Sequence, residues 1–156
     1  MGKFSDDKIA GGEVQKEVCA FLNRFYRKEF GKCEEVVGYF PKWDIIAGKG
    51  KTFEVKYDRF CHRTRNFFIE IVGFNKSCAD YWVLVDSDNY HFIQRGKLEN
   101  LIGMCELRKM GGDKKAWEGW LIPSCNVKHN STIYPRTWQK EPEWYQKYII
   151  EQRKAK

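Results

Sequence analysis

The spacing of apolar residues in the first third of the chain predicts a helix followed by a β-hairpin. Residues 13–29 carry apolar side chains at steps of three and four, which is typical of an amphipathic helix with one buried face. Residues 36–41 and 43–47 are predicted to be extended, and residues 52–57 alternate between polar and apolar positions as a strand does. Because the glycine-containing segment 48–50 separates the last two segments, they are expected to pair as a hairpin.

The rest of the chain is predicted to continue the sheet and to add helices around it. Apolar runs predict three more strands, at 66–72, 81–85 and 90–94. The run at 81–85 is continuously apolar and is expected at the centre of the sheet. Beyond these strands the pattern predicts a helix at 97–109, a short edge strand at 120–123 and a closing helix that begins at Pro142. Strands grouped between helices are typical of an α/β or α+β fold with one central sheet.

Length and composition indicate one folded domain. The chain has 156 residues, of which 42% are hydrophobic and 16% aromatic, so we expect a single domain with its own core over residues 1–156. The sequence has no apolar run near the ~20 residues of a membrane span, and its N-terminus does not look like a signal peptide. Its six cysteines form no CxxC pair, which favours free thiols in a reducing compartment. A cytoplasmic protein without a membrane span is therefore expected.

The charge of the chain favours a polyanionic partner. Lysine and arginine number 28 against 21 aspartate and glutamate, which gives a formal net charge of +7. A basic surface attracts polyanions, above all the phosphates of nucleic acids. A soluble basic protein without any nucleic-acid role is the alternative.

The predicted hairpin carries the most informative side chains. Because alternate residues of a strand share a face, Glu54 and Lys56 are expected side by side. If the turn has three residues, with Gly50 at a left-handed bulge position, Asp44 pairs with Glu54 and both carboxylates face the same side. A four-residue turn would instead place Asp44 opposite Val55 and direct the two acids to opposite faces.

Two carboxylates beside a lysine are suited to a hydrolytic metal site. Acids on an otherwise apolar sheet are costly to bury without a compensating cation. Carboxylate oxygens suit Mg²⁺, or Mn²⁺ in its place, and such an ion typically takes one or two protein carboxylates and keeps several waters. The ion activates a water that a nearby lysine can orient, which is the chemistry of phosphodiester hydrolysis. The alternative is a surface hairpin in which Asp44, Glu54 and Lys56 form exposed ion pairs.

The order of these features resembles a known nuclease superfamily. A helix is followed by Asp44 in an extended segment and by Glu54-Val55-Lys56 in the next strand. With this order, roughly residues 11–95 resemble the PD-(D/E)xK nuclease superfamily. Within it, the segments 54–70 and 79–83 are most similar to phage-encoded and Holliday-junction-resolvase-like members. The resemblance favours a viral or mobile-element origin.

The resemblance also implies a fold and a set of roles. It implies a restriction-endonuclease-like core, which is a mixed central β-sheet flanked by helices, with residues 96–156 as a C-terminal helical elaboration. It implies that Asp44, Glu54 and the carbonyl of Val55 bind Mg²⁺ and that Lys56 is the catalytic lysine.

Further residues are candidates for supporting such a site. Many resolvase-like relatives add an acid from the first helix, and Glu17, at the edge of the apolar stripe, suits this catalytic role better than Glu13 does. A solvated glutamate on the flank of a helix explains Glu17 equally well. Asp58, Asn66 and Glu70 could support the site, although strand-end capping and ordinary surface contacts are simpler uses.

Basic and aromatic residues are candidates for nucleic-acid contacts. Positively charged side chains near the hairpin could bind backbone phosphates, and they are Arg59, Arg63, Arg65, Lys49 and Lys51. A solvated basic loop is the alternative. Four tryptophans in polar surroundings could stack on bases, although core packing or an oligomer interface is the simpler use: Trp117, Trp120, Trp138 and Trp144.

The sequence thus predicts a Mg²⁺-dependent DNA endonuclease that hydrolyses phosphodiester bonds and could select branched or structured DNA. No sequence-reading module is visible, and a homodimer could present two sites to two strands. One alternative is a sequence-specific restriction-type endonuclease with base contacts from residues 96–156. Another is a non-catalytic nucleic-acid-binding module, which would have no need for two acids near phosphates.

Overall fold

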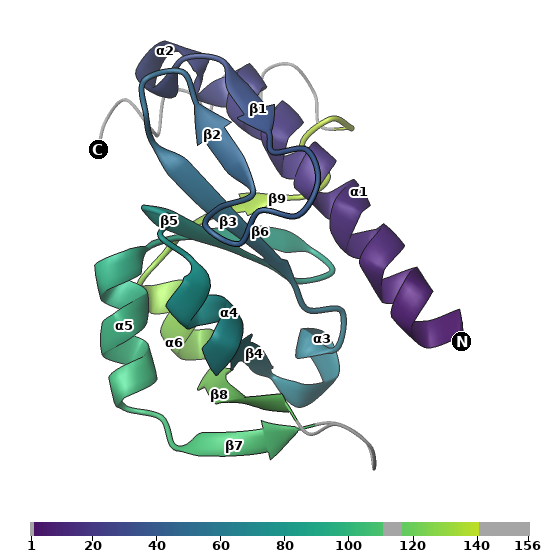
Figure 1. Ribbon diagram of the computed structural model, residues 1–156, viewed down its shortest axis with the longest axis vertical. Helices are drawn as coiled ribbons and strands as arrows, with labels where there is room; N and C mark the ends of the chain where they lie inside the picture. The colour runs from purple at the N-terminus through teal and green to yellow at the C-terminus, as the bar shows by residue number, and fades with distance from the viewer. Residues whose placement is uncertain (1, 111–116, 141–156) are drawn as a thin grey trace.

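A mixed six-stranded sheet forms the centre of the protein (Figure 1). The structure is a computed structural model, and it describes residues 2–110 and 117–140. Across the sheet, the strands are in order β1 (Cys33–Glu35), β2 (Ile45–Ala47), β3 (Thr52–Tyr57), β5 (Tyr81–Val85), β6 (Asn89–Gln94) and β9 (Thr132–Pro135). β3 and β5 run parallel, and the other neighbouring strands run antiparallel.

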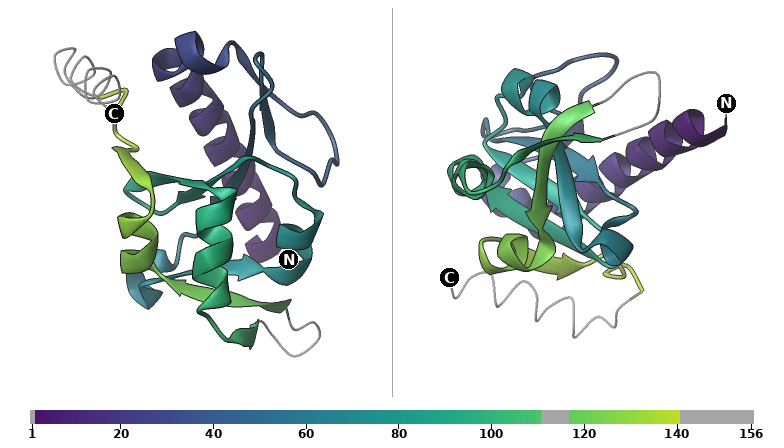
Figure 2. Two further views of the ribbon diagram at one scale, coloured as in Figure 1. Left: turned by 90° about the vertical axis from the view of Figure 1, so that its left-hand side faces the viewer. Right: turned by 90° about the horizontal axis from the view of Figure 1, so that it is seen from below.

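Helices and a smaller sheet cover the two faces of the central sheet (Figures 1 and 2). One face packs against α1 (Gly2–Phe25), which leads into the short α2 (Arg27–Phe30). The other face packs against α4 (Ile71–Lys76), α5 (Arg95–Gly103) and α6 (Ser124–His129). It also packs against an antiparallel sheet in the order β4 (Asn66–Glu70), β8 (Trp117–Pro123), β7 (Leu107–Met110). α3 (Cys61–Thr64) connects β3 to β4. The predicted α/β fold, a mixed central sheet flanked by helices, is confirmed.

The central sheet separates two apolar cores, and β5 contributes to both. Val83 and Val85 pack into the core beneath α1, whereas Trp82 and Leu84 pack into the core beneath α4 and α5. All four side chains are buried, so the prediction that this strand is central is confirmed. Among the helices of the described residues, none is long and apolar enough to cross a membrane.

The strand β3 has an apolar face and a charged face. Phe53, Val55 and Tyr57 pack toward the core beneath α1, as the alternation in the sequence predicts. Glu54 and Lys56 therefore point to the opposite face, where Glu54 contacts the residue after α4 and Lys56 contacts β4. This alternation places the two charged side chains next to each other, on the side of the core beneath α4 and α5 (the second core).

The register of the β2–β3 hairpin is set by a three-residue turn. Ala47 N–H donates to the Lys51 carbonyl at 2.8 Å, and Gly50 N–H donates to the Ala47 carbonyl at 2.8 Å. Gly50 has a φ of +100°, which glycine adopts far more readily than other residues. The Cα pairs are Ile45 with Phe53 and Ile46 with Thr52, and the paired residues of β2 begin at Ile45. Of the two registers left open by the sequence, the three-residue turn is confirmed.

The start of β3 is also fixed to the start of β5. The carboxylate of Asp80 accepts hydrogen bonds from the N–H of Thr52 at 2.9 Å and from its hydroxyl at 3.0 Å. Asp80 N–H in turn donates to the Thr52 carbonyl at 3.1 Å. These contacts join two segments that are 28 residues apart in sequence and hold the parallel pair in register.

In the first half of the chain, the structure corrects some predicted bounds. The strands predicted at 52–57 and 81–85 have the expected bounds. The extended segment at 36–41 is wrong, because the strand ends at Glu35 and the chain then forms a loop. The predicted helix 13–29 begins earlier, at Gly2, and is interrupted at Tyr26.

The second half of the chain departs further from the prediction. The predicted strand 66–72 ends at Glu70, and the predicted helix 97–109 ends at Gly103 and is followed by β7. β8 is the middle strand of the small sheet and not an edge strand. The expected helical elaboration thus contributes β7, β8 and β9 as well as helices, because these strands pair with segments far away in sequence. The closing helix predicted from Pro142 lies outside the described residues.

Replacing Gly50 is expected to destabilise the protein because its positive φ disfavours a side chain. Gly50→Ala should lower the free energy of unfolding by ~1–2 kcal/mol in urea denaturation. The matched control is Gly12→Ala, which lies within α1 with open space where a Cβ would stand and should raise stability by about 0.5–1 kcal/mol. Equal effects of the two substitutions would contradict the assigned turn.

Candidate functional site

Asp44 comes directly before β2 and lies close enough to Glu54 on β3 for its charge to act on that carboxylate. Asp44 N–H donates to the carbonyl of Phe53 at 2.9 Å, although Phe53 pairs with Ile45, so Asp44 lies one residue off the register of the β2–β3 ladder. Asp44 Oδ2 accepts a hydrogen bond from Val55 N–H at 2.8 Å. The carboxylate of Asp44 is therefore held against the backbone of the strand that carries Glu54.

The segment after α4 holds Glu54 from the other side. Ser77 Oγ lies 3.3 Å from Glu54 Oε2 and 3.2 Å from the carbonyl oxygen of Lys42. Cys78 N–H also donates to this carbonyl, at 2.8 Å. The loop that leads into Asp44 and the segment that contacts Glu54 are thus joined directly to each other.

Arg95 fixes this segment in place. Its guanidinium donates to the carbonyls of Ser77 at 2.8 Å and Phe74 at 3.2 Å, which lie at the C-terminal end of α4. The guanidinium carbon also lies 4.3 Å from the centre of the Phe74 ring. A cation near a helix C-terminus is favourable, and here it also positions the hydroxyl next to Glu54.

Lys56 completes the group on this face of β3. Its Nζ lies 3.7 Å from Glu70 Oε1 on β4, and both side chains are about one-third exposed. The ammonium group is therefore held by Glu70 and still accessible to solvent. Its charge favours the ionised forms of both Asp44 and Glu54.

Burial and neighbouring acids disfavour the charged forms of both carboxylates. Burial raises the pKa of Asp44 above its ordinary value, and the charge of Glu35 adds to this, although the hydrogen bond from Val55 N–H opposes it. Burial, followed by the charge of Asp44, raises the pKa of Glu54 to about 8, against the opposing effects of Ser77 and Lys56. Near neutral pH the pair therefore retains a proton, which a divalent cation could replace.

The residues present are compatible with a Mg²⁺ site that has few protein ligands. Among the described residues, no group of three or more His, Cys, Asp or Glu side chains is arranged to hold a metal ion. Mg²⁺ typically needs only one or two carboxylates and keeps several waters, so the pair Asp44 and Glu54 is sufficient. In a strand, a residue directs its N–H and C=O to the same side, so the Val55 carbonyl points to the same edge as its N–H, beyond the end of β2.

The structure does not bring Glu17 to this site. Its carboxylate accepts two hydrogen bonds from Arg136, at 3.1 and 3.0 Å, and one from the Tyr90 hydroxyl at 2.5 Å. The Tyr90 hydroxyl also accepts a hydrogen bond from Trp138 Nε1 at 3.1 Å. The prediction that Glu17 reaches the metal site is therefore corrected: Glu17 joins α1 to β6 and to the segment after β9.

Of the three predicted supporting residues, only Glu70 contacts a site residue. Asp58 accepts hydrogen bonds from the N–H groups of Phe60 at 3.0 Å and Phe68 at 3.1 Å, so it fixes the end of β3 to β4. The side-chain amide of Asn66 donates to the Thr64 carbonyl at 2.8 Å within its own turn. Asp58 and Asn66 thus have the simpler role of fixing strand ends.

The predicted phosphate-binding residues fall into two groups at opposite ends of β3. Arg59 and Arg63 lie 4.7 and 5.0 Å from the ring centre of Phe60, which is partly exposed, and Arg65 ends α3 in a left-handed conformation. Lys49 and Lys51 lie at the hairpin turn, where Lys49 Nζ donates to the carbonyl of Lys28 at 2.9 Å. The structure therefore does not gather these five residues into one patch.

Sequence reasoning missed Ser77 and Arg95. Both belong to the surroundings of Glu54, from which they are 23 and 41 positions away along the chain. Neither residue stands in a motif with Glu54, and no local pattern relates them. Only the packing of α4 and α5 on the central sheet brings them close.

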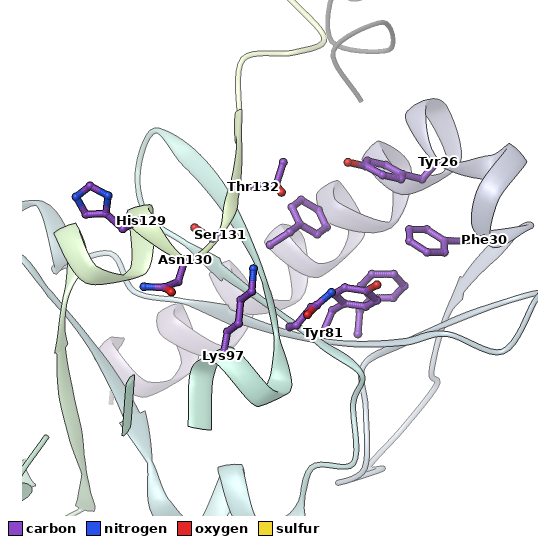
Figure 3. A pocket seen from close by; sticks show the side chains of 11 residues that line it. Tyr26, Phe30, Tyr81, Lys97, His129, Asn130, Ser131 and Thr132 are labelled. Atoms are coloured by element: carbon purple, nitrogen blue, oxygen red, sulfur yellow. The ribbon is translucent and has the colours of Figure 1, made fainter. Parts of the chain in front are cut away.

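A well-formed hollow lies elsewhere. It has a volume of about 420 Å³ and is lined by aromatic side chains such as Tyr26, Phe30 and Tyr81, with Lys97 and His129 at one side (Figure 3). Neither this hollow nor a shallower one near Arg95 includes Asp44, Glu54 or Lys56. The candidate site is therefore separate from both of these hollows.

Removing the acid at position 54 is expected to stabilise the metal-free protein at alkaline pH. Because the folded state raises the pKa of Glu54 from 4.5 to about 8, wild-type stability should fall as the pH rises through this window. Glu54→Gln removes this loss, so the difference in melting temperature between variant and wild type should grow between pH 5 and 8.5. This difference is measured by thermal unfolding in chelator across that pH range. A melting-temperature difference that does not change with pH would contradict the raised pKa of Glu54.

Known proteins do not supply a family for this chain. Family models, curated proteins and solved structures all give no match. Its function is therefore inferred from the geometry of the site.

Proposed function

We propose that the protein is a Mg²⁺-dependent nuclease that hydrolyses phosphodiester bonds in DNA. The observation that carries the proposal is the convergence of the carboxylates of Asp44 and Glu54, with Lys56 two residues after Glu54 on the same face of β3. Partly buried carboxylates with raised pKa values, next to a lysine that is about one-third exposed, are typical of functional sites and are costly in a purely structural role.

The order and pairing of the elements support the same proposal. α1 precedes the antiparallel strands β1, β2 and β3, and β5 then pairs parallel with β3. This is the arrangement expected of a restriction-endonuclease-like core, as in the PD-(D/E)xK superfamily that the sequence resembles. In that superfamily, the paired acids and the lysine hold the positions of Asp44, Glu54 and Lys56.

Each residue has a distinct role in the proposed reaction. Asp44, Glu54 and the carbonyl of Val55 would hold the cation, which supplies a Lewis acid and a water of lowered pKa when it is bound. Lys56 orients the attacking water and stabilises the negative charge that develops on the phosphate. Glu70 keeps the ammonium group of Lys56 in position, and Ser77 keeps the carboxylate of Glu54 in position.

The charge of the protein favours a nucleic acid as the substrate. With a net charge of +7, the chain attracts phosphate backbones, and the side chain of Lys56 is partly exposed to solvent. A protein that only bound nucleic acid would gain nothing from two acids beside the phosphates, because the acids would repel them. Hydrolysis explains the acids, and binding alone does not.

Asp44→Asn, Glu54→Gln and Lys56→Ala are each expected to abolish metal-dependent cleavage while the protein remains folded. The first two remove a charge from the cation site, and the third removes the group acting on the water, for which a loss of ~10²–10⁴-fold in rate is typical. The assay follows labelled single-stranded, duplex, flap and four-way-junction DNA on gels with Mg²⁺, Mn²⁺ or chelator.

The control for this assay is Asp88→Asn, which changes an exposed acid in the turn between β5 and β6 and should cleave like wild type. Cleavage that survives all three site substitutions would refute the assignment. Wild-type protein that binds DNA but never cuts it, whatever the metal, would favour the non-catalytic module.

Mn²⁺ is expected to raise the melting temperature of the wild type, because an ion that binds only the folded state stabilises it. Asp44→Asn should lose this shift. Glu17→Gln should instead lower the melting temperature without metal and retain the Mn²⁺ shift, because its carboxylate pairs with Arg136. The reverse result, with the shift lost in Glu17→Gln and retained in Asp44→Asn, would place the ion elsewhere.

A further inference from the structure

The loop between β1 and β2 exposes apolar side chains next to the candidate site. Of these, Val37 is 96% exposed, Tyr39 is 86% exposed and Phe40 is 37% exposed. In the left view of Figure 2, this dark-blue connection stands away from the rest of the chain. Contiguous exposed apolar residues are uncommon on soluble proteins and commonly mark an interaction surface.

The loop is held at both ends, so its side chains have a defined place. Val36 N–H donates to the Asp44 carbonyl at 2.9 Å, and the Lys42 carbonyl accepts hydrogen bonds from the segment after α4. Within the loop, the ring of Phe40 packs edge-on against Trp43, with 4.9 Å between ring centres. The loop therefore presents Tyr39 and Phe40 from a fixed base that ends at Asp44.

The surroundings of the loop favour a nucleic-acid strand as its partner. Asp44, which follows the loop directly, is one of the two carboxylates proposed to act on phosphodiesters. Lys42 is exposed within the loop, and Lys76 is exposed next to the segment that contacts it, so positive charge accompanies the rings. Aromatic rings bind the faces of bases, and these faces are accessible only where bases are unpaired.

The tryptophans that the sequence offered for stacking are less suitable. Trp138 is buried in the core beneath α1, and Trp120 packs against the core beneath α4 and α5. Trp117 and Trp144 lie among the residues whose side chains are not described. Tyr39 and Phe40 are instead exposed and beside the site.

We propose that Tyr39 and Phe40 stack on unpaired bases and so direct the site to single-stranded or branched DNA. This inference rests on the proposed function, because the loop would select the strand that Asp44, Glu54 and Lys56 cut. It explains a feature that hydrolysis alone does not require, namely aromatic side chains held in solvent a few residues before a site acid.

The test is fluorescence anisotropy with two labelled DNAs, an oligothymidylate strand and a blunt duplex of the same length, in chelator so that no cleavage occurs. The double variant Tyr39→Ala with Phe40→Ala should bind the single strand about tenfold more weakly and the duplex with unchanged affinity. Val37→Ala, in the same loop, is the matched control and should bind both DNAs like wild type. Tyr39→Trp should retain single-strand binding, because it retains a ring.

An equal loss of affinity for both DNAs, or no loss for either, would overturn the inference. Unchanged melting temperatures would show that the variants are folded. The proposed function is tested separately by cleavage. If the wild type cuts duplex and single-stranded DNA with Mg²⁺ but the loop variant binds both DNAs like wild type, the nuclease proposal is retained. The stacking proposal is then refuted.

Discussion

The arrangement of the candidate site depends on the length of one turn. With three residues between Ala47 and Lys51, Ile45 pairs with Phe53, and Asp44, the residue before Ile45, lies near Glu54, the residue after Phe53. A slip by one residue would direct the two carboxylates to opposite faces, because side chains alternate along a strand. Gly50, with its positive φ, makes this turn favourable, and Thr52 and Asp80 then hold β3 against β5. The position of the two acids thus follows from backbone geometry.

The second layer of the fold completes the site. α4 ends next to Glu54, and Arg95 at the start of α5 binds the carbonyls at that end. Ser77 reaches Glu54 from there, while Glu70 on β4 holds Lys56. The small sheet and the helices on this face therefore do more than cover the core. They bring together a partly buried acid pair that favours a cation and a lysine that remains in contact with solvent.

Local patterns in the sequence were sufficient for the hairpin, for the two faces of β3 and for the central strand β5, because glycine positions and alternation act over a few residues. They failed where pairing is long-range. The partner of Glu17 is Arg136, 119 residues away, so an acid on the flank of a helix could not be distinguished from a site residue. β8 lies between β4 and β7, which no local run of apolar residues indicates. Aromatic character likewise did not distinguish buried Trp138 from exposed Tyr39.

Asp44 and Glu54 are proposed to bind one divalent cation from the end of a single hairpin. The most direct measurement is anomalous X-ray diffraction from crystals of the wild-type protein containing Mn²⁺. The account predicts an anomalous peak between these two carboxylates, next to the carbonyl of Val55, and no such peak in crystals of Asp44→Asn. A peak at Glu17, or a pair of carboxylates that stays metal-free while Mn²⁺ binds elsewhere, would contradict it.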